Sequence, residues 1–235
     1  MSVKAVVFDL DGTLANFNLD YKNVRAEVRG YLINVGVPAS VLSTNDSIFD
    51  MLNKTEIFLK NSGKNHRLVE QTREGAFAIA EKYELDAAKS TGLLPGVIEC
   101  LRTLKKLGIK IGLFTINSEK SVNYILDRFN IRDFFDVVIP RNRVEYVKPH
   151  PEHLGAVLKS LNINSRNTMV VGDSITDMRS ANELKAIAVG LPTGISTVDQ
   201  LMSNGADYII TSIIDLPVLV DKENKRSGQS KKESK

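Results

Sequence analysis

The sequence predicts an α/β protein with a doubly wound parallel sheet and a helical segment inserted near its start. Three observations lead to this class. A short β-branched apolar run lies close to the N-terminus, at residues 3–8. Similar runs alternate with amphipathic segments of about ten residues over the second half of the chain. Between these parts, residues 16–87 show helical periodicity alone. Strands that alternate with helices form a parallel sheet covered on both faces.

Apolar runs and amphipathic stripes set the expected elements. We expect strands at 3–8, 110–114, 135–139, 168–171 and 186–189, with a short sixth at 208–210. We expect helices at 95–108, 118–129, 151–161 and 175–183, and within the insert at 24–35, 46–60 and 66–83. Ligands of such sheets bind beyond the C-terminal ends of the strands. The polar residues that directly follow each strand are therefore the candidates for function.

The same pattern suggests how the chain is divided. We expect an α/β core of residues 1–15 and 88–221, a helical cap of residues 16–87 and a tail of residues 222–235. An insert directly after the first strand would hang over the strand end and act as a lid. The tail has six Lys or Arg, two Glu and no apolar residue, which predicts disorder. The tail's formal charge of +4 is larger than the net charge of +3 of the whole chain, so residues 1–221 carry no net positive charge. They therefore lack the basic face that is expected of a nucleic-acid-binding protein.

Composition limits the class of protein further. The chain has 235 residues, of which 43% are hydrophobic and 25% charged, as in ordinary globular proteins. No apolar run is long enough to cross a bilayer, so we expect no membrane partner. A single cysteine, Cys100, excludes an internal disulfide, and we expect a cytoplasmic location. The three histidines, His66, His150 and His153, are expected on the surface.

Two carboxylates, Asp9 and Asp11, follow the first apolar run. Residues i and i+2 of an extended chain point the same way, so both side chains would face one site. Gly12 allows the chain to turn sharply there. Two anions side by side are costly unless a cation pairs with them. The pair therefore indicates a metal site, a proton-sharing pair of carboxyls, or both, whereas a solvated Asp-rich turn is the alternative.

Two further features follow later strands. Thr115 comes directly after the second strand, ahead of Ile116 and Asn117. A hydroxyl and open backbone N–H groups before a helix form a cradle for phosphate, although a plain helix cap has the same composition. Lys148 precedes Pro149, which restricts the lysine to extended geometry. A cation fixed there would neutralise carboxylate and phosphate charge, whereas an exposed lysine in a helix-entry loop is the alternative.

A third feature follows the fourth strand, where Gly172 and Asp173 are followed four residues later by Asp177. The second carboxylate lies about one helical turn beyond the first. Carboxylate oxygens suit Mg²⁺, which needs few protein ligands. A helix-capping Asp beside a surface Asp is the alternative. All of these features lie at strand ends, and so does the first Asp pair.

In chain order, these residues resemble the haloacid dehalogenase-like (HAD) superfamily. Its four signatures are matched by Asp9-Leu10-Asp11-Gly12-Thr13, by Thr115, by Lys148-Pro149, and by Gly172-Asp173 with Asp177. The resemblance covers residues 3–220, and the insert resembles the superfamily's α-helical cap. The chain is most similar to the branch of phosphoglycolate phosphatase and β-phosphoglucomutase. Many members have Asn directly after the Thr of the second signature, where this chain has Ile116 followed by Asn117.

The resemblance implies a Rossmann-like core and Mg²⁺-dependent hydrolysis of a small phosphorylated metabolite through an aspartyl-phosphate. It implies that Asp9 is the nucleophile and that Asp11 is the general acid and base. The phosphoryl group would be held by Thr115, Ile116, Asn117 and Lys148. The metal would be bound by Asp9, by the backbone carbonyl of Asp11 and by Asp173. Asp177 would orient a metal-bound water or Lys148.

Three functions remain open at this level. A phosphatase acting on a small phosphate monoester is the leading hypothesis, since Asp11 supplies a general acid that carbon–halogen cleavage does not need. A phosphosugar mutase similar to β-phosphoglucomutase is the alternative, because the cap sequence does not reveal whether water is excluded. A binding protein with a retired site is the third hypothesis. The intact Asp9, Asp11, Lys148 and Asp173 weigh against it.

Overall fold

A computed structural model describes residues 2–16 and 18–230. The chain divides into two compact units. One unit is formed by Met1–Phe17 and Thr91–Lys235, and the other by Asn18–Ser90. No helix among the described residues is both long and apolar enough to cross a membrane.

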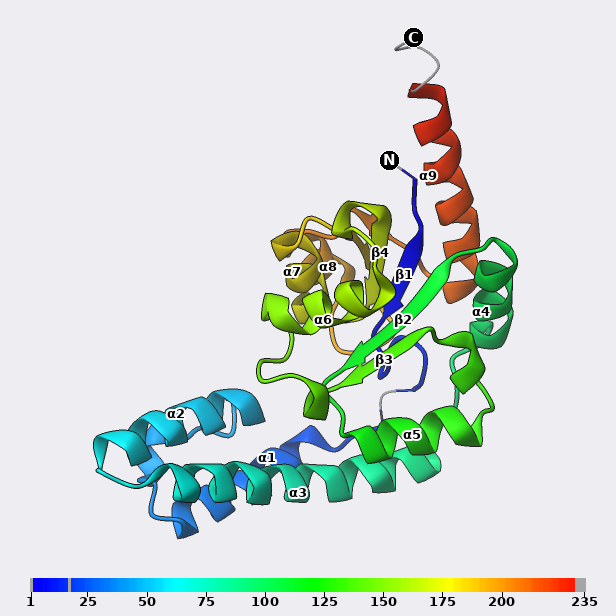
Figure 1. The fold of residues 1–235 in the computed structure, drawn as a ribbon. Helices are drawn as coiled ribbons and strands as arrows, with labels where there is room; N and C mark the ends of the chain where they lie inside the picture. The colour runs from blue at the N-terminus through cyan, green and yellow to red at the C-terminus, as the bar shows by residue number, and fades with distance from the viewer. Residues whose placement is uncertain (1, 17, 231–235) are drawn as a thin grey trace. The chain divides into compact units, whose positions relative to one another are not determined.

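The first unit contains a six-stranded parallel sheet in the order β3-β2-β1-β4-β5-β6 (Figure 1). Its strands are β1 (Ala5–Phe8), β2 (Lys110–Thr115), β3 (Val137–Pro140), β4 (Thr168–Gly172), β5 (Ile187–Gly190) and β6 (Tyr208–Ile209). The expected α/β class and parallel sheet are confirmed. Strand β1 pairs with β2 on one side and with β4 on the other. The strand order therefore switches direction at β1, and sheets of this type bind ligands at such a point.

Helices cover both faces of this sheet. They are α4 (Val97–Lys106), α5 (Glu119–Arg128), α6 (Pro151–Leu161), α7 (Ile175–Glu183), α8 (Val198–Ser203) and α9 (Leu216–Ser230). Figure 1 shows α6, α7 and α8 on one side of the sheet and α4 and α9 on the other. On the first side, Val7 of β1 packs in one buried cluster with Val157 of α6 and Met178 of α7. This packing makes the sheet a rigid base for the residues at its edge.

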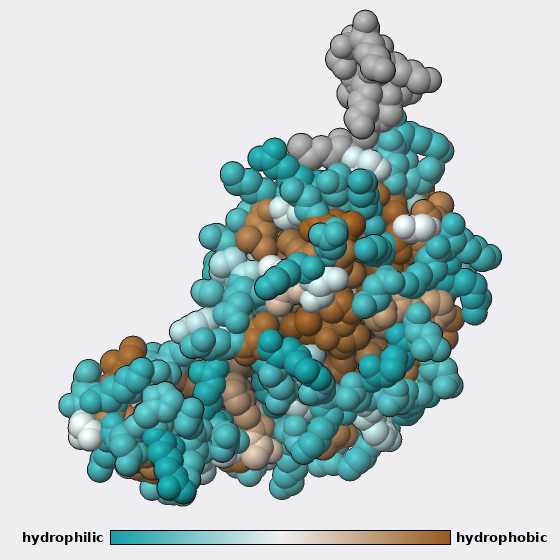
Figure 2. Space-filling model, viewed as in Figure 1, coloured by the Kyte–Doolittle hydropathy of each residue, from teal (hydrophilic) through white to brown (hydrophobic). Residues whose placement is uncertain are grey.

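The second unit is a group of three helices. They are α1 (Tyr21–Asn34), α2 (Ile48–Asn61) and α3 (His66–Ser90). Helix α2 begins with a capping box between Ser47 and Asp50, which satisfies backbone donors at its first turn. Buried Val28, Met51 and Ala76, one from each helix, belong to a common core. In Figure 2, hydrophilic residues cover most of the visible face of this unit.

The C-terminal segment differs from the sequence-based expectation. Disorder was expected from residue 222, but α9 continues to Ser230, while residues 231–235 lie outside the described residues. Polar contacts explain the helix. The side chain of Asn224 accepts a hydrogen bond of 2.6 Å from the backbone N–H of Val3, and Tyr208 donates one of 2.8 Å to Glu223. A segment without apolar residues is thus tied to the sheet unit by side-chain hydrogen bonds that composition does not reveal.

Candidate active site

The C-terminal ends of β1 and β4 bring three carboxylates together. The backbone N–H of Asp9 donates to the carbonyl of Val171 over 2.9 Å, so the end of β1 is aligned with the end of β4. Asp173 leaves β4, and Asp177 lies in the first turn of α7. Ligand oxygens of Asp9, Asp173 and Asp177 all lie within 4.8 Å of one another, and all three residues are buried. The sheet topology therefore gathers residues that are more than 160 positions apart in the sequence.

Lys148 lies among these carboxylates. Its Nζ is 2.5 Å from Oδ1 of Asp9 and 2.8 Å from Oδ1 of Asp177. Its side chain is only 3% exposed, and the Nζ lies 4.6 Å from the ring centre of Phe114 at the end of β2. A buried ammonium between two carboxylates is held in one place.

Hydrogen bonds and glycines fix the two carboxylates of the β4–α7 turn. Oδ2 of Asp177 accepts from the hydroxyl and the backbone N–H of Ser174, in a capping box that starts α7. Oδ2 of Asp173 accepts from the backbone N–H of Ile195 over 2.9 Å. Gly12 has a φ of +79°, and a Cβ there would come within 2.6 Å of the Asp173 carboxyl. A Cβ at Gly194 would overlap the same carboxyl.

The electrostatics of this cluster are dominated by burial. Burial raises the pKa of Asp9 to about 8, although the nearby Lys148 opposes the rise. Burial and the neighbouring Asp177 raise the pKa of Asp173 to about 6. The pKa of Lys148 is raised by Asp177 and Asp9, which outweigh its own burial. Three carboxylates and one ammonium leave a formal charge of −2 if all four are ionised, so the cluster lacks positive charge.

A divalent cation fits this cluster. Its donors are carboxylate oxygens, which suit a hard ion such as Mg²⁺. Lys148 alone does not offset the burial of Asp9, and the pKa of this carboxyl stays well above its usual range. A second positive charge beside Asp9 and Asp173 would favour their ionised forms. The residues present therefore fit a divalent cation.

The second strand brings its own end to the same edge. Thr115 is the last residue of β2, is buried, and accepts from the backbone N–H of Asn117 over 3.2 Å. The side-chain amide of Asn117 donates to Oδ2 of Asp11 over 2.6 Å. Ile116 is half-buried, and its carbonyl accepts from the guanidinium of Arg141 over 2.9 Å. Asn117, which was expected to hold phosphate, thus contacts Asp11 through a side-chain hydrogen bond that the sequence did not reveal.

His153 was expected on the surface, and this expectation is wrong. The residue is fully buried on α6. Its Nδ1 accepts from the backbone N–H of Lys148 over 3.2 Å, and its Nε2 lies 2.9 Å from the carbonyl of Ile139. The accepting Nδ1 makes Nε2 the protonated nitrogen, which donates to Ile139. The ring also packs edge-on against Phe114, with centroids 5.4 Å apart. Burial lowers the pKa of His153 to about 4, so the ring is neutral and ties the Lys148 loop to β3.

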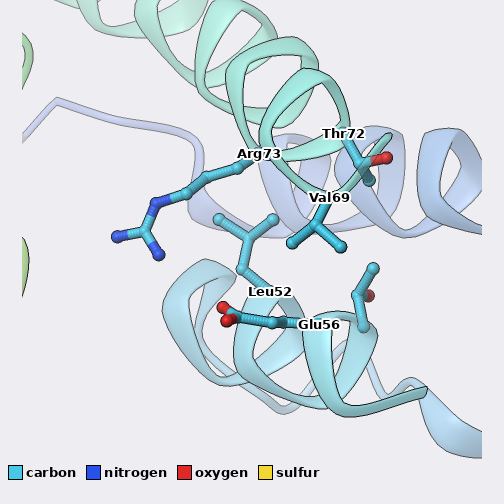
Figure 3. A pocket seen from close by; sticks show the side chains of 6 residues that line it. Leu52, Glu56, Val69, Thr72 and Arg73 are labelled. Atoms are coloured by element: carbon cyan, nitrogen blue, oxygen red, sulfur yellow. The ribbon is translucent and has the colours of Figure 1, made fainter. Parts of the chain in front are cut away.

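A small hollow lies elsewhere, between α2 and α3 of the helical unit (Figure 3). It has a volume of about 210 Å³, which includes the solvent at its open side. Leu52 and Val69 line it together with Glu56 and Arg73. These residues provide no grouping of acids and bases comparable to the cluster around Asp9, so the catalytic candidates remain at the sheet edge.

Known proteins with related sequences identify the family of this chain. The haloacid dehalogenase-like hydrolase family matches residues 3–185. A phosphoglycolate phosphatase of Yersinia pseudotuberculosis is 28% identical over 232 residues, which cover 94% of this chain and 97% of that protein. The pyrophosphatase PpaX of Bacillus mycoides is 29% identical over 226 residues, covering 93% and 98% respectively.

A solved structure extends the comparison to the fold. The crystal structure of a predicted phosphoglycolate phosphatase from Haemophilus somnus has a TM-score of 0.63 at 21% identity. The match covers 93% of this chain and 98% of that one. The family match spans most of the chain and includes the three carboxylates of the acidic cluster, Lys148 and Asp11. This chain belongs to the haloacid dehalogenase-like hydrolase family, and the expected resemblance is confirmed.

Proposed function

We propose that this hydrolase is a phosphatase that cleaves a small phosphate monoester through an aspartyl-phosphate at Asp9. The observation that carries the proposal is the position of Asp9, with Lys148 2.5 Å away and Asp173 in the same buried cluster. An anionic nucleophile can approach an anionic phosphate only where positive charge is concentrated. The phosphatase names of the Yersinia and Bacillus relatives support the same reaction class.

In the first step, a carboxylate oxygen of Asp9 attacks phosphorus, and the bond between phosphorus and the ester oxygen breaks. The proton of the Asp11 carboxyl passes to that leaving oxygen, and the alcohol departs. Lys148 and the backbone N–H groups after Thr115 hold the phosphoryl oxygens and offset their charge. The backbone N–H of Ile116 is one such donor, whereas the backbone N–H of Asn117 donates to the hydroxyl of Thr115.

In the second step, a water attacks the phosphorus of the aspartyl-phosphate, and its proton passes to the Asp11 carboxylate. The bond between Asp9 and phosphorus breaks, and inorganic phosphate leaves. The site returns to its starting state, with Asp9 ionised and Asp11 protonated. One difficult displacement is thereby divided into two easier ones.

We assign Mg²⁺ to Asp9, Asp173 and the backbone carbonyl of Asp11, with Asp177 acting through Lys148 and through the turn that begins α7. When bound, the ion would supply the positive charge that the buried carboxylates lack. Asp177 holds the lysine at 2.8 Å and is itself held by Ser174, so it fixes the position of the ammonium.

The experiment measures phosphate release by the purified protein with Mg²⁺. Its substrates are p-nitrophenyl phosphate, phosphoglycolate, a hexose 1-phosphate and inorganic pyrophosphate. The Asp9→Asn variant is the blank, and Asp133→Asn, an exposed aspartate of the same unit, is the matched control. We expect release from at least one monoester that is lost in Asp9→Asn and kept in Asp133→Asn.

Borohydride reduction during turnover tests the intermediate directly, because it converts an aspartyl-phosphate to homoserine. Mass spectrometry should locate this change at Asp9. An isomerised hexose phosphate without phosphate release would assign the chain to the mutase alternative. Absence of turnover on every substrate, together with no reduced residue, would refute the proposal and favour a retired site.

A further inference from the structure

The side chain of Asn117 makes a hydrogen bond that the proposed chemistry has not yet used. Asn117 is only 4% exposed, and its amide nitrogen donates to Oδ2 of Asp11 over 2.6 Å. We propose that Asn117 is a positioning residue that orients the Asp11 carboxyl for proton transfer to the leaving group. This inference rests on the function proposed above, in which Asp11 donates a proton to the leaving ester oxygen.

The backbone around Asn117 is held by three contacts, so the position from which its side chain extends is fixed. Its backbone N–H donates to the hydroxyl of Thr115 at the end of β2. Its carbonyl accepts from the backbone N–H of Arg141 over 3.2 Å. The next residue, Ser118, caps α5 with its side chain. A side chain anchored between a strand end and a helix start can keep a partner in one rotamer.

The other amide atom supports a functional reading of this contact. Oδ1 of Asn117 is buried and accepts no hydrogen bond from the described residues. A buried acceptor without a donor is costly, and such groups concentrate where function requires a particular arrangement. If Asn117 served packing alone, an apolar residue of the same shape would avoid that cost. The hydrogen bond to Asp11 accounts for a polar side chain at this buried position.

The direction of the bond has a chemical consequence. A carboxyl oxygen that accepts an N–H is a poor position for a proton, so the acidic proton of Asp11 belongs on Oδ1. The amide is neutral, and it therefore fixes the carboxyl without adding a charge to the site. It also leaves the phosphoryl group to the backbone donors of this loop, since the amide nitrogen is engaged with Asp11. Asn117 thus selects which oxygen faces the leaving group.

Leaving-group dependence separates this role from a structural one. An alkyl phosphate expels a strongly basic oxygen, so breaking its phosphorus–oxygen bond needs the proton from Asp11. p-Nitrophenyl phosphate expels a weakly basic oxygen and needs that proton far less. The test variant is Asn117→Leu, which keeps the shape and removes the donor. The matched control is Asn142→Ala, at an asparagine that accepts from the backbone N–H of Glu119 at the start of α5.

We expect Asn117→Leu to lower kcat for an alkyl phosphate about tenfold more than kcat for p-nitrophenyl phosphate. The control should lower the two values by the same factor. In an Asp11→Ala background, Asn117→Leu should leave the ratio of the two rates unchanged, because the carboxyl that it orients is gone. Borohydride trapping at Asp9 should persist in every variant on p-nitrophenyl phosphate.

Two results would overturn the inference while leaving the proposed function intact. One is an equal loss on both substrates in Asn117→Leu, with wild-type hydrolysis still dependent on Asp9. The other is a further change of the ratio when Asn117→Leu is added to Asp11→Ala. If the wild-type protein hydrolyses neither substrate, the proposed function fails first, and the role of Asn117 falls with it.

Discussion

Replacement of His153 by Phe tests whether a buried neutral histidine supports the Lys148 loop. The wild-type ring accepts from the N–H of Lys148 and donates to the carbonyl of Ile139. Phe preserves the ring packing against Phe114 and removes both hydrogen bonds. At pH 7 each of the two backbone groups left without a partner should cost about 1–3 kcal/mol of unfolding free energy.

The effect of pH follows from the lowered pKa of His153, which falls from 6.5 to about 4 through burial. Between these values the unfolded chain binds a proton at this position and the folded chain does not. His153 therefore contributes stability that is complete above pH 6.5 and is lost as the pH falls toward 4. A shift from 6.5 to about 4 corresponds to about 3 kcal/mol. The difference in stability between wild type and His153→Phe should shrink by up to that amount on acidification.

Urea unfolding followed by far-ultraviolet circular dichroism measures this difference, since the chain has no tryptophan. Titrations common to both proteins, such as those of Asp9 and Asp173, cancel in the comparison. With only three histidines in the chain, long-range ¹H–¹⁵N spectra should also identify the His153 ring as protonated at Nε2 alone. Parallel pH profiles for the two proteins, or a His153 ring that titrates near 6.5, would refute the reasoning.

Three further predictions concern the acidic cluster. Mg²⁺ should bind more tightly at pH 8 than at pH 5 by calorimetry, because at pH 5 it must displace the proton that burial holds on Asp9, and Asp173→Asn should abolish the heat. Lys148→Met should lower kcat by about 100-fold or more and, in EDTA, lower the unfolding free energy by about 3 kcal/mol, since Asp9 and Asp177 lose their buried cation. Unchanged urea midpoints would contradict the second part. Gly194→Ala should weaken Mg²⁺ binding while circular dichroism keeps the helical signal, because its Cβ would overlap the Asp173 carboxyl.

The acidic residues could be predicted from sequence because their position depends on local pattern. Asp9 and Asp173 each come directly after a short apolar strand. The carboxyl ends of parallel strands meet at one edge of the sheet. This rule and the order of the strands are enough to predict that the two side chains lie close together. Lys148 was suggested by the proline that follows it, and the structure brings its Nζ to Asp9.

The contacts that were missed depend on packing between distant segments. His153 resembles a surface residue of an amphipathic helix until α6 packs on the sheet and buries it. Asn117 and Asp11 are 106 positions apart, and no local pattern predicts that their side chains meet. The polar end of α9 likewise folds because Asn224 reaches Val3, 221 positions away. Such pairings are set by topology, which hydrophobic periodicity defines only in outline.

The glycines around the acidic cluster have a consequence for ion capture. Gly12 and Gly194 crowd the Asp173 carboxyl, and a Cβ at Gly172 would overlap that of Asp177. These carboxylates have little room to choose between rotamers before an ion arrives. A preorganised pair gives up little conformational entropy on coordination and needs no rearrangement of its backbone. For the ion proposed above, we therefore expect selectivity to depend on backbone positions that fix these carboxylates, more than on side chains that can adjust.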